Sequence, residues 1–266
     1  MTPRDALLEL LCEPLPPGLA REARGRLEKA AAEEFSRAGV AFASLRAFAT
    51  SRRLGLRAAG VPASAFKALP GLFSRALSGL DLPGSEAWEP SGFPFPRPVR
   101  GLLALHGERP AAFELAGLRA GRVTEGHEAL GSRRLTVPSA DRYFRALEQA
   151  SVLADDEARL AAMRASLEAA SRRIKLGVEA HEETLLEALY SCEYPCLVVS
   201  GFAHGFLALP PERLRAALRA LRFFPVSDDD GRPQPYFAAF RDGVSKGQRN
   251  VEDGYRAALE NALSRN

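Results

Sequence analysis

The stretch Ala6-Leu7-Leu8-Glu9-Leu10-Leu11-Cys12 is a short apolar run, and it is closed by Pro14, Pro16 and Pro17. An apolar run of this length that ends in turn-forming residues predicts a buried strand. Pro17 suits the first position of a helix, and the apolar residues after it recur every three to four positions until Gly39. This part of the sequence therefore predicts a strand followed by a helix.

The segments that follow this helix alternate between strand-like and helix-like patterns. Residues 42–60 predict a β-hairpin that carries Arg52 and Arg53 between its two strands. Further segments are expected as a helix at 66–80, a short helix at 97–106, strand-like pieces at 111–137, and a helix at 139–149 with Ser139 as its N-cap. The prolines between residues 61 and 98 predict loops around these elements.

The remaining residues predict helices at 155–175, 179–190, 211–221 and 251–263, and strands at 195–199, 223–226 and 236–240. The last two strands flank Asp228-Asp229-Asp230-Gly231, which is typical of a hairpin turn. We therefore expect an α+β protein with mixed helices, mostly antiparallel sheets and two packed subdomains. Residues 1–150 would form an N-terminal α+β domain, and residues 151–266 a helical hairpin plus an α+β domain.

Composition limits the class of protein. Hydrophobic residues make up 46% and charged residues 26% of the chain, as in ordinary globular proteins, and the net charge is only +3. There are three cysteines, the sequence opens without a signal-like stretch, and charged residues interrupt every apolar run. These features predict a cytoplasmic protein that does not insert into a membrane, and the mild net charge does not indicate a dedicated DNA-binding domain.

No pattern of residues predicts a self-contained active site. Cys192, Cys196, His181 and His204 fall near one another in the sequence, but their spacing differs from the paired ligands of structural zinc sites. The acidic run that ends at Gly231 lacks the alternating ligands of a calcium loop. Neither a glycine-rich phosphate loop nor a nucleophile motif is present. We expect no catalytic residue, no metal ligand and no cofactor in this chain.

Arginines gather at several places and are the candidate binding residues. On the helix expected at 211–221, Arg215, Arg219 and Arg222 follow one another at helical spacing beside an apolar stripe. Taken singly, each small cluster is expected to be a solvated or ion-paired surface, whereas several converging clusters would form an electrostatic footprint for RNA. His127 stands in a glycine turn and would either contact a ligand or serve as a hydrogen-bonded structural residue. The full candidate set comprises Arg52, Arg53, Arg97, Arg100, Arg122, His127, Arg215, Arg219 and Arg222.

Four places in the sequence carry a resemblance to a known family. They are Leu8-Glu9 through Cys12-Glu13-Pro14-Leu15-Pro16-Pro17; Phe48-Ala49-Thr50-Ser51-Arg52-Arg53-Leu54; Arg97-Pro98-Val99-Arg100 with Phe113–Gly117 and Gly121–His127; and Phe206–Pro210 running into Phe223–Val226. In this order, the segments resemble the amino-terminal part of the β subunit of the bacterial tetrameric glycyl-tRNA synthetase. The sequence departs from the family pattern at Ser51, where a proline is usual, and at Glu128 and Ala129, where an arginine and a phenylalanine are usual.

The resemblance implies a polypeptide that binds tRNA(Gly) and assembles with a separate α subunit in a heterotetramer. In that family the α subunit joins glycine to tRNA and uses ATP and Mg, while this part of the β subunit supplies no aminoacylation chemistry. Family members continue for several hundred residues through an HD-like domain and an anticodon-binding domain.

Three hypotheses follow. The first is a β-subunit-type component of glycine-tRNA ligase that contributes tRNA binding and subunit assembly. The second is a stand-alone, non-enzymatic RNA-binding or scaffold module derived from the same family. The third is an unrelated small-molecule enzyme whose site the sequence does not reveal.

Overall fold

The computed structural model describes residues 2–265, which form two compact units, one up to Asp156 and one from Glu157 onward. Each unit has its own antiparallel sheet and its own apolar core. The α+β class expected from the sequence is confirmed. The domain limits at residues 150 and 151 stay a prediction.

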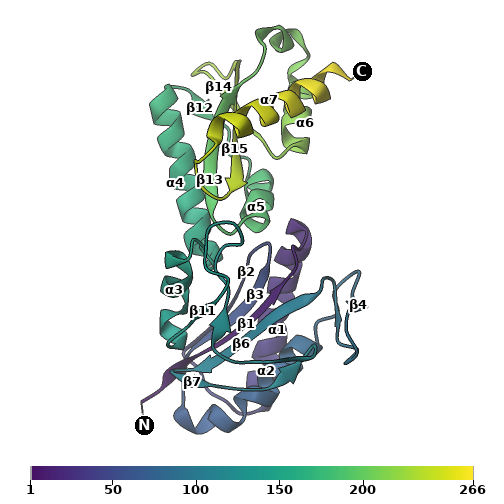
Figure 1. The fold of residues 1–266 in the computed structure, drawn as a ribbon. Helices are drawn as coiled ribbons and strands as arrows, with labels where there is room; N and C mark the ends of the chain where they lie inside the picture. Colours follow the sequence, from purple (N-terminus) through teal and green to yellow (C-terminus); the bar gives the residue numbers. More distant parts are fainter. Residues whose placement is uncertain (1, 266) are drawn as a thin grey trace. The chain divides into compact units, whose positions relative to one another are not determined.

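The first unit is built around a five-stranded antiparallel sheet (Figure 1). In spatial order its strands are β2 (Ser44–Ala49), β3 (Arg53–Val61), β1 (Arg4–Cys12), β6 (Val99–His106) and β7 (Arg109–Pro110). β1 lies in the middle of the sheet, paired with β3 on one edge and β6 on the other. Every residue from Ala6 to Cys12 is buried, so both faces of β1 are covered. The buried strand and the hairpin expected at 42–60 are both confirmed.

Helices cover both faces of this sheet, with α1 and α2 on one side and α3 on the other (Figure 1). The helices are α1 (Pro17–Arg37), α2 (Leu69–Ser78) and α3 (Tyr143–Gln149), with 3-10 turns η1 (Ala63–Lys67) and η2 (Ala140–Arg142). The helices expected after Pro17, within 66–80 and within 139–149 are therefore confirmed. Ser139 does precede η2, but its side chain makes no capping hydrogen bond.

Short strand pairs fill the loops between these elements. They are β4 (Glu86–Ala87) with β5 (Pro94–Phe95), β8 (Glu114–Leu115) with β9 (Leu118–Arg119), and β10 (Val123–Thr124) with β11 (Leu135–Thr136). The strand-like pieces expected at 111–137 are confirmed. The pairing of β10 with β11 brings together the two ends of the loop of residues 125–134.

The prediction of a helix at 97–106 is wrong, since most of this segment is the strand β6. The segment is buried against β1, and it contains an irregularity that hides the strand pattern. Leu11 pairs with Gly101, but Cys12 pairs with Val99, so Arg100 is an extra residue that has no partner in the ladder. Such a bulge turns the local side chain and interrupts the alternation that predicts a strand.

The core on the α3 side of the sheet joins the sheet to the segment after β11. Leu7, Phe48 and Leu105 from the sheet pack with Tyr143 and Leu147 of α3. Phe48 and Tyr143 have ring centroids 5.5 Å apart. Because burying side chains of this size contributes about 1.5–3 kcal/mol each, this cluster fixes α3 firmly on the sheet.

Glu34 joins α1 to α2 on the other side of the sheet. Its carboxylate accepts a hydrogen bond from Arg75 Nε at 2.6 Å and also contacts Arg37. The hydrogen bond from Arg75 is the main cause that holds the pKa of Glu34 below its ordinary value; burial opposes it, and the charges of Arg37 and Arg75 add to it. A carboxylate with a lowered pKa in the folded state stabilises the fold only where it is ionised.

We expect Glu34→Gln to lower the free energy of unfolding at pH 7 and to have less effect in acid. The contribution of Glu34 is fully present above the ordinary pKa that a glutamate has in the unfolded chain, and it is lost as the pH falls through the lower folded pKa. Urea unfolding of both proteins between pH 7 and pH 3 measures the difference. Arg75→Gln should show the same pH dependence, and a difference that stays constant across this range would contradict the role of Glu34.

The second unit has a four-stranded antiparallel sheet in the order β12-β14-β15-β13. Its strands are β12 (Gly177–Val178), β13 (Pro195–Gly201), β14 (Phe224–Ser227) and β15 (Pro233–Asp242), and its helices are α4 (Asp156–Ile174), α5 (Glu182–Ser191), α6 (Pro211–Ala220) and α7 (Gln248–Ser264), with the turn η3 (His204–Ala208). The helices and strands expected here are confirmed, and Asp228 closes the predicted turn by accepting hydrogen bonds from the backbone of Asp230 and Arg232.

α6 and α7 share one apolar core with this sheet. Leu214 and Leu218 of α6 meet Leu259 and Leu263 of α7 in a buried cluster with Phe237 of β15. The apolar stripe predicted for α6 therefore faces inward, while Arg219 of the same helix is exposed.

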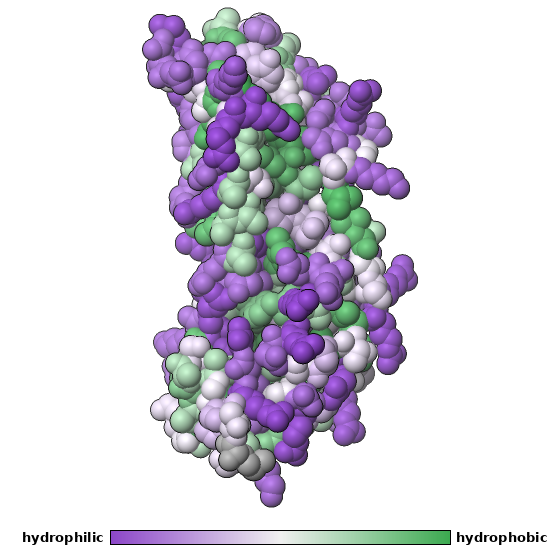
Figure 2. Space-filling model, turned by 90° about the vertical axis from the view of Figure 1, so that its left-hand side faces the viewer, coloured by the Kyte–Doolittle hydropathy of each residue, from purple (hydrophilic) through white to green (hydrophobic). Residues whose placement is uncertain are grey.

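The surface is mainly hydrophilic on the face drawn in Figure 2, where exposed apolar residues form separate patches. Among residues 2–265, no helix has the length and apolar character needed to cross a membrane.

Candidate nucleic-acid interface

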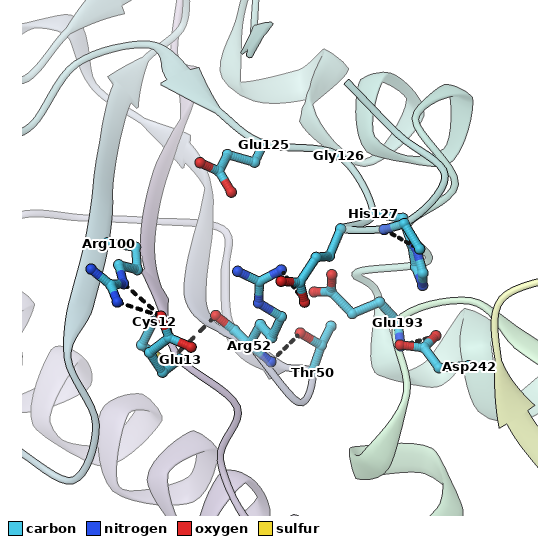
Figure 3. Close-up of polar contacts among 12 residues, drawn as sticks. Cys12, Glu13, Thr50, Arg52, Arg100, Glu125, Gly126, His127, Glu193 and Asp242 are labelled. Carbon is cyan, nitrogen blue, oxygen red and sulfur yellow. Dashed lines mark hydrogen bonds and ion pairs between the residues drawn. The ribbon is translucent and has the colours of Figure 1, made fainter. Parts of the chain in front are cut away.

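A cavity of about 360 Å³ in the first unit brings several candidate residues together. Its lining consists of Arg52, Arg100, Glu125, Gly126, His127, Glu128 and Arg133. Arg52 comes from the turn between β2 and β3, Arg100 from the bulge in β6, and the other residues from the loop between β10 and β11 (Figure 3). Three segments that are distant in the sequence thus meet around one hollow.

Arg52 is the least exposed arginine of the cavity and has a fixed backbone. Its N–H donates to Thr50 Oγ1 at 3.1 Å, and its carbonyl accepts a hydrogen bond from the Cys12 N–H at 2.8 Å (Figure 3). Only 12% of its side chain is exposed, and Nη1 lies 3.0 Å from a carboxylate oxygen of Glu128. Its Nε is buried and has no hydrogen-bond partner within residues 2–265.

Arg53 has a different role from its neighbour, because its side chain is completely buried. Its Nη1 lies 3.1 Å from Glu9 and donates to Thr124 Oγ1 at 2.9 Å. Its Nη2 donates to the carbonyls of Glu125 at 2.7 Å and Gly126 at 3.3 Å. Arg53 cannot reach an RNA from this position, because no part of its side chain is exposed. It holds the loop that lines the cavity.

Glu9 is the buried acceptor at the centre of this network. It accepts hydrogen bonds from the hydroxyls of Thr124 and Tyr143 as well as from Arg53. The network therefore connects β1, β3, β10 and α3. A buried carboxylate needs such a set of donors, because an isolated ion in the interior is strongly disfavoured.

Arg100 stands at the rim of the cavity. Its Nε and Nη2 lie 2.7 Å and 2.6 Å from Glu13 Oε1, and just over half of its side chain is exposed (Figure 3). The bulge at this position turns the side chain away from the regular ladder. Arg100 is thus both oriented and accessible.

His127 is held tightly by its loop. Its N–H donates to the carbonyl of Ala150 at 2.9 Å, and its Nδ1 accepts a hydrogen bond from the Ala129 N–H at 3.2 Å. The residue is 6% exposed. Of the two roles considered from the sequence, the structural one has direct support in these contacts, while a ligand contact stays a prediction.

The other candidate arginines lie outside the cavity. Arg97 is exposed, and Arg122 donates to the carbonyl of Glu108 at 2.6 Å. Arg215 of α6 has its Nε 3.8 Å from Glu179, and Arg222, which follows the end of α6 at Ala220, has its Nε 3.0 Å from Glu187. Two arginines of the predicted cationic face are therefore already paired with glutamates.

Arg219, the third of them, is exposed and has no ion pair within residues 2–265. An exposed ion pair contributes at most about 1 kcal/mol, so the paired arginines remain able to exchange partners with a phosphate. The α6 face thus stays a candidate surface.

Reasoning from the sequence did not place Glu125, Gly126, Glu128 and Arg133 in the candidate site. Two features of the sequence could have pointed to this loop. Glu128 stands directly after His127 at a position that departs from the family pattern, and Arg133 is followed by a second arginine, Arg134. Neither feature shows that the two ends of this loop approach the turn at Arg52, because that requires the pairing of β10 with β11.

The described residues offer no group of His, Cys, Asp or Glu side chains arranged to hold a metal ion. Burial raises the pKa of Cys192 to about 12, although the charge of Arg159 opposes this rise. Burial also raises the pKa of the Cys196 thiol. Both thiols are therefore protonated at neutral pH and are poor nucleophiles.

The family described as "Glycyl-tRNA synthetase beta subunit" matches residues 62–264, which is more than half of the chain. The chain belongs to the glycyl-tRNA synthetase β-subunit family. The match includes Arg100, His127 and the α6 arginines, but it begins after Arg52. The family resemblance inferred from the sequence is confirmed.

Individual members of the β-subunit family give the same result. The chain is 34% identical over 198 residues to the glycine–tRNA ligase β subunit of Halothermothrix orenii, a match that covers 74% of this chain and 28% of the relative. It is 30% identical over 244 residues to that of Xanthomonas campestris, covering 91% and 35%. It is 37% identical over 178 residues to that of Alteromonas mediterranea, covering 66% and 26%. The chain thus spans about a quarter to a third of the length of these β subunits.

Proposed function

We propose that this chain is a β-subunit-type component of glycine-tRNA ligase that contributes tRNA binding and subunit assembly. ATP-dependent formation of glycyl-tRNA takes place on a separate α subunit, which uses the ATP and Mg, and the complex is a cytoplasmic heterotetramer. The observation that carries the proposal is the cavity lined by Arg52, Arg100 and Arg133 in a chain of this family. Arginine is well suited to phosphates, because its planar fork of donors matches their oxygens.

Binding of tRNA(Gly), measured with and without the α subunit across a salt series, tests the proposal. If phosphates are contacted, the logarithm of the affinity should fall linearly with the logarithm of the salt concentration, by roughly 0.7–0.9 per phosphate neutralised. We expect binding that strengthens when the α subunit is present. Binding that is equally tight without it would favour the stand-alone RNA-binding or scaffold module, and the absence of tRNA binding in both cases would contradict both.

We expect simultaneous replacement of Arg215, Arg219 and Arg222 with glutamine to weaken tRNA binding and to reduce the salt dependence. The slope should fall by roughly 0.7–0.9 for each arginine that meets a phosphate. The free energy of unfolding should change by no more than about 0.5 kcal/mol per residue, because exposed charges contribute little to stability.

The control is a variant with the same loss of charge elsewhere. Arg172, Arg173 and Arg232 are exposed and lie outside both candidate surfaces, so their replacement with glutamine should leave the slope of the salt series unchanged. If both triple variants bound tRNA equally, the α6 face would have no specific role.

A further inference from the structure

The chain places one of its own carboxylates against the least exposed arginine of the cavity. We propose that this cavity is a phosphate-binding site that Glu128 masks, so that a phosphate group must displace the Glu128 carboxylate from Arg52. Phosphate binding does not depend on the proposed function, whereas the assignment of that phosphate to an RNA backbone rests on it.

The two members of the pair differ in their freedom to move. The Glu128 side chain is 71% exposed, so its carboxylate can leave the pair and enter solvent at little cost. The Arg52 side chain is 12% exposed, and hydrogen bonds to Thr50 and Cys12 fix its backbone. Displacement of the Glu128 carboxylate would therefore leave a preformed cationic group in the lining of the cavity.

Glu128 does not satisfy every hydrogen-bond donor of the Arg52 guanidinium. The carboxylate approaches Nη1 at 3.0 Å, whereas the buried Nε has no hydrogen-bond partner in the described chain. A buried donor without an acceptor is unfavourable, because it has lost its hydrogen bonds to water. A phosphate can accept from Nε and a terminal nitrogen together, because the guanidinium presents its donors as a fork. The unsatisfied Nε thus favours a phosphate over the single contact with Glu128.

The charges around Arg52 support the same ligand. Arg133 is exposed at the rim and has no ion pair within residues 2–265. Arg100 is already oriented by Glu13. When the Glu128 carboxylate leaves, the lining holds three arginines and Glu125, while Glu13 still pairs with Arg100. A phosphate would then enter a site with a net positive charge.

Titration of the full chain with inorganic phosphate at fixed ionic strength tests the proposal, and the Arg52 Nε resonance in a ¹⁵N-labelled sample reports on the site. Glu128→Gln removes the competing charge at nearly constant size. It should tighten phosphate binding by roughly two- to fivefold, which corresponds to the strength of an exposed ion pair. Arg52→Gln should weaken binding by at least about tenfold, as expected for the loss of charge-assisted hydrogen bonds.

Matched variants separate these effects from general ones. Glu182→Gln removes the same charge from the exposed pair with Arg164 in the second unit, and it should leave phosphate affinity unchanged. Arg52→Lys keeps the charge but loses the fork of donors, so it should bind phosphate with intermediate affinity. Thermal unfolding of each variant shows whether it is folded. If Arg52→Gln does not fold, Arg52→Lys still tests the role of Arg52.

Either of two results overturns the proposal. The first is that Glu128→Gln binds phosphate with the same affinity as the parent chain. The second is that Arg52→Gln does not weaken phosphate binding. Repeating the series with tRNA(Gly) identifies the source of the phosphate. A parallel gain for tRNA in Glu128→Gln supports an RNA backbone, and a gain for inorganic phosphate alone supports a free phosphate group at the masked site. If neither ligand responds, the masked site is overturned even when the parent chain binds tRNA, whereas the proposed function is tested separately by the binding of tRNA with and without the α subunit.

Discussion

Replacing Arg53 with methionine should lower the free energy of unfolding by about 3–5 kcal/mol, which is the usual cost of breaking a buried ion pair by removing one partner. Methionine fills much of the space of the arginine stem but leaves the Glu9 carboxylate buried without its cation. It also removes the donors to the carbonyls of Glu125 and Gly126. Urea unfolding followed by circular dichroism measures the loss.

Two further variants show whether the effect comes from the buried charge. Arg57→Met breaks the pair with Asp5, which is partly exposed, and should cost no more than about 1 kcal/mol. Combining Glu9→Gln with Arg53→Met should recover part of the loss, because the glutamine is neutral and can still accept from Tyr143. An Arg53→Met variant as stable as Arg57→Met would show that the network does not hold the loop.

Gly131→Ala should lower the free energy of unfolding by about 3 kcal/mol, the upper end of what overpacking usually costs. A Cβ at this position would lie 2.4 Å from the N atom of His127 and 2.5 Å from the carbonyl oxygen of Ala150. Both are backbone atoms, so a side chain cannot move aside to make room. The loop would have to change, and with it the cavity lining between Glu125 and Arg133.

The control for Gly131→Ala is a glycine that has open space around it. Gly25 is exposed on α1, and a Cβ there would meet nothing within 4 Å. Gly25→Ala should therefore stabilise the protein by about 0.5–1 kcal/mol, because alanine is the better helix former. Thermal unfolding of both variants gives the comparison, and equal effects of the two substitutions would contradict the steric argument.

Elements with a regular pattern could be predicted from the sequence. The helix after Pro17, the hairpin around Arg52 and the stripe on α6 each follow one period for their whole length, and each is present in the structure. β6 could not be predicted in this way. It is buried between β1 and β7, so it lacks an alternation of polar residues, and the extra residue Arg100 shifts its phase.

The candidate site was predictable only in part, because neighbours in the sequence have different environments. Arg52 and Arg53 looked equivalent, yet one lines the cavity and the other is buried with Glu9. The alternation of side chains at the start of a strand could have separated them, and the lone carboxylate in the apolar run of β1 could have indicated a buried basic partner. The contact of Glu128 with Arg52 depends on tertiary structure and could not be predicted from the local sequence.

The central position of β1 has a consequence for how the protein is made. β1 leaves the ribosome before β3 and long before β6, and it needs both of them to satisfy its two edges. At about 5–20 residues per second, roughly 5–20 s pass before residues 99–106 have been added. During that interval a strand of leucines with an open edge is exposed to other nascent chains. We therefore expect this segment to need a chaperone or the early docking of α1 to avoid aggregation.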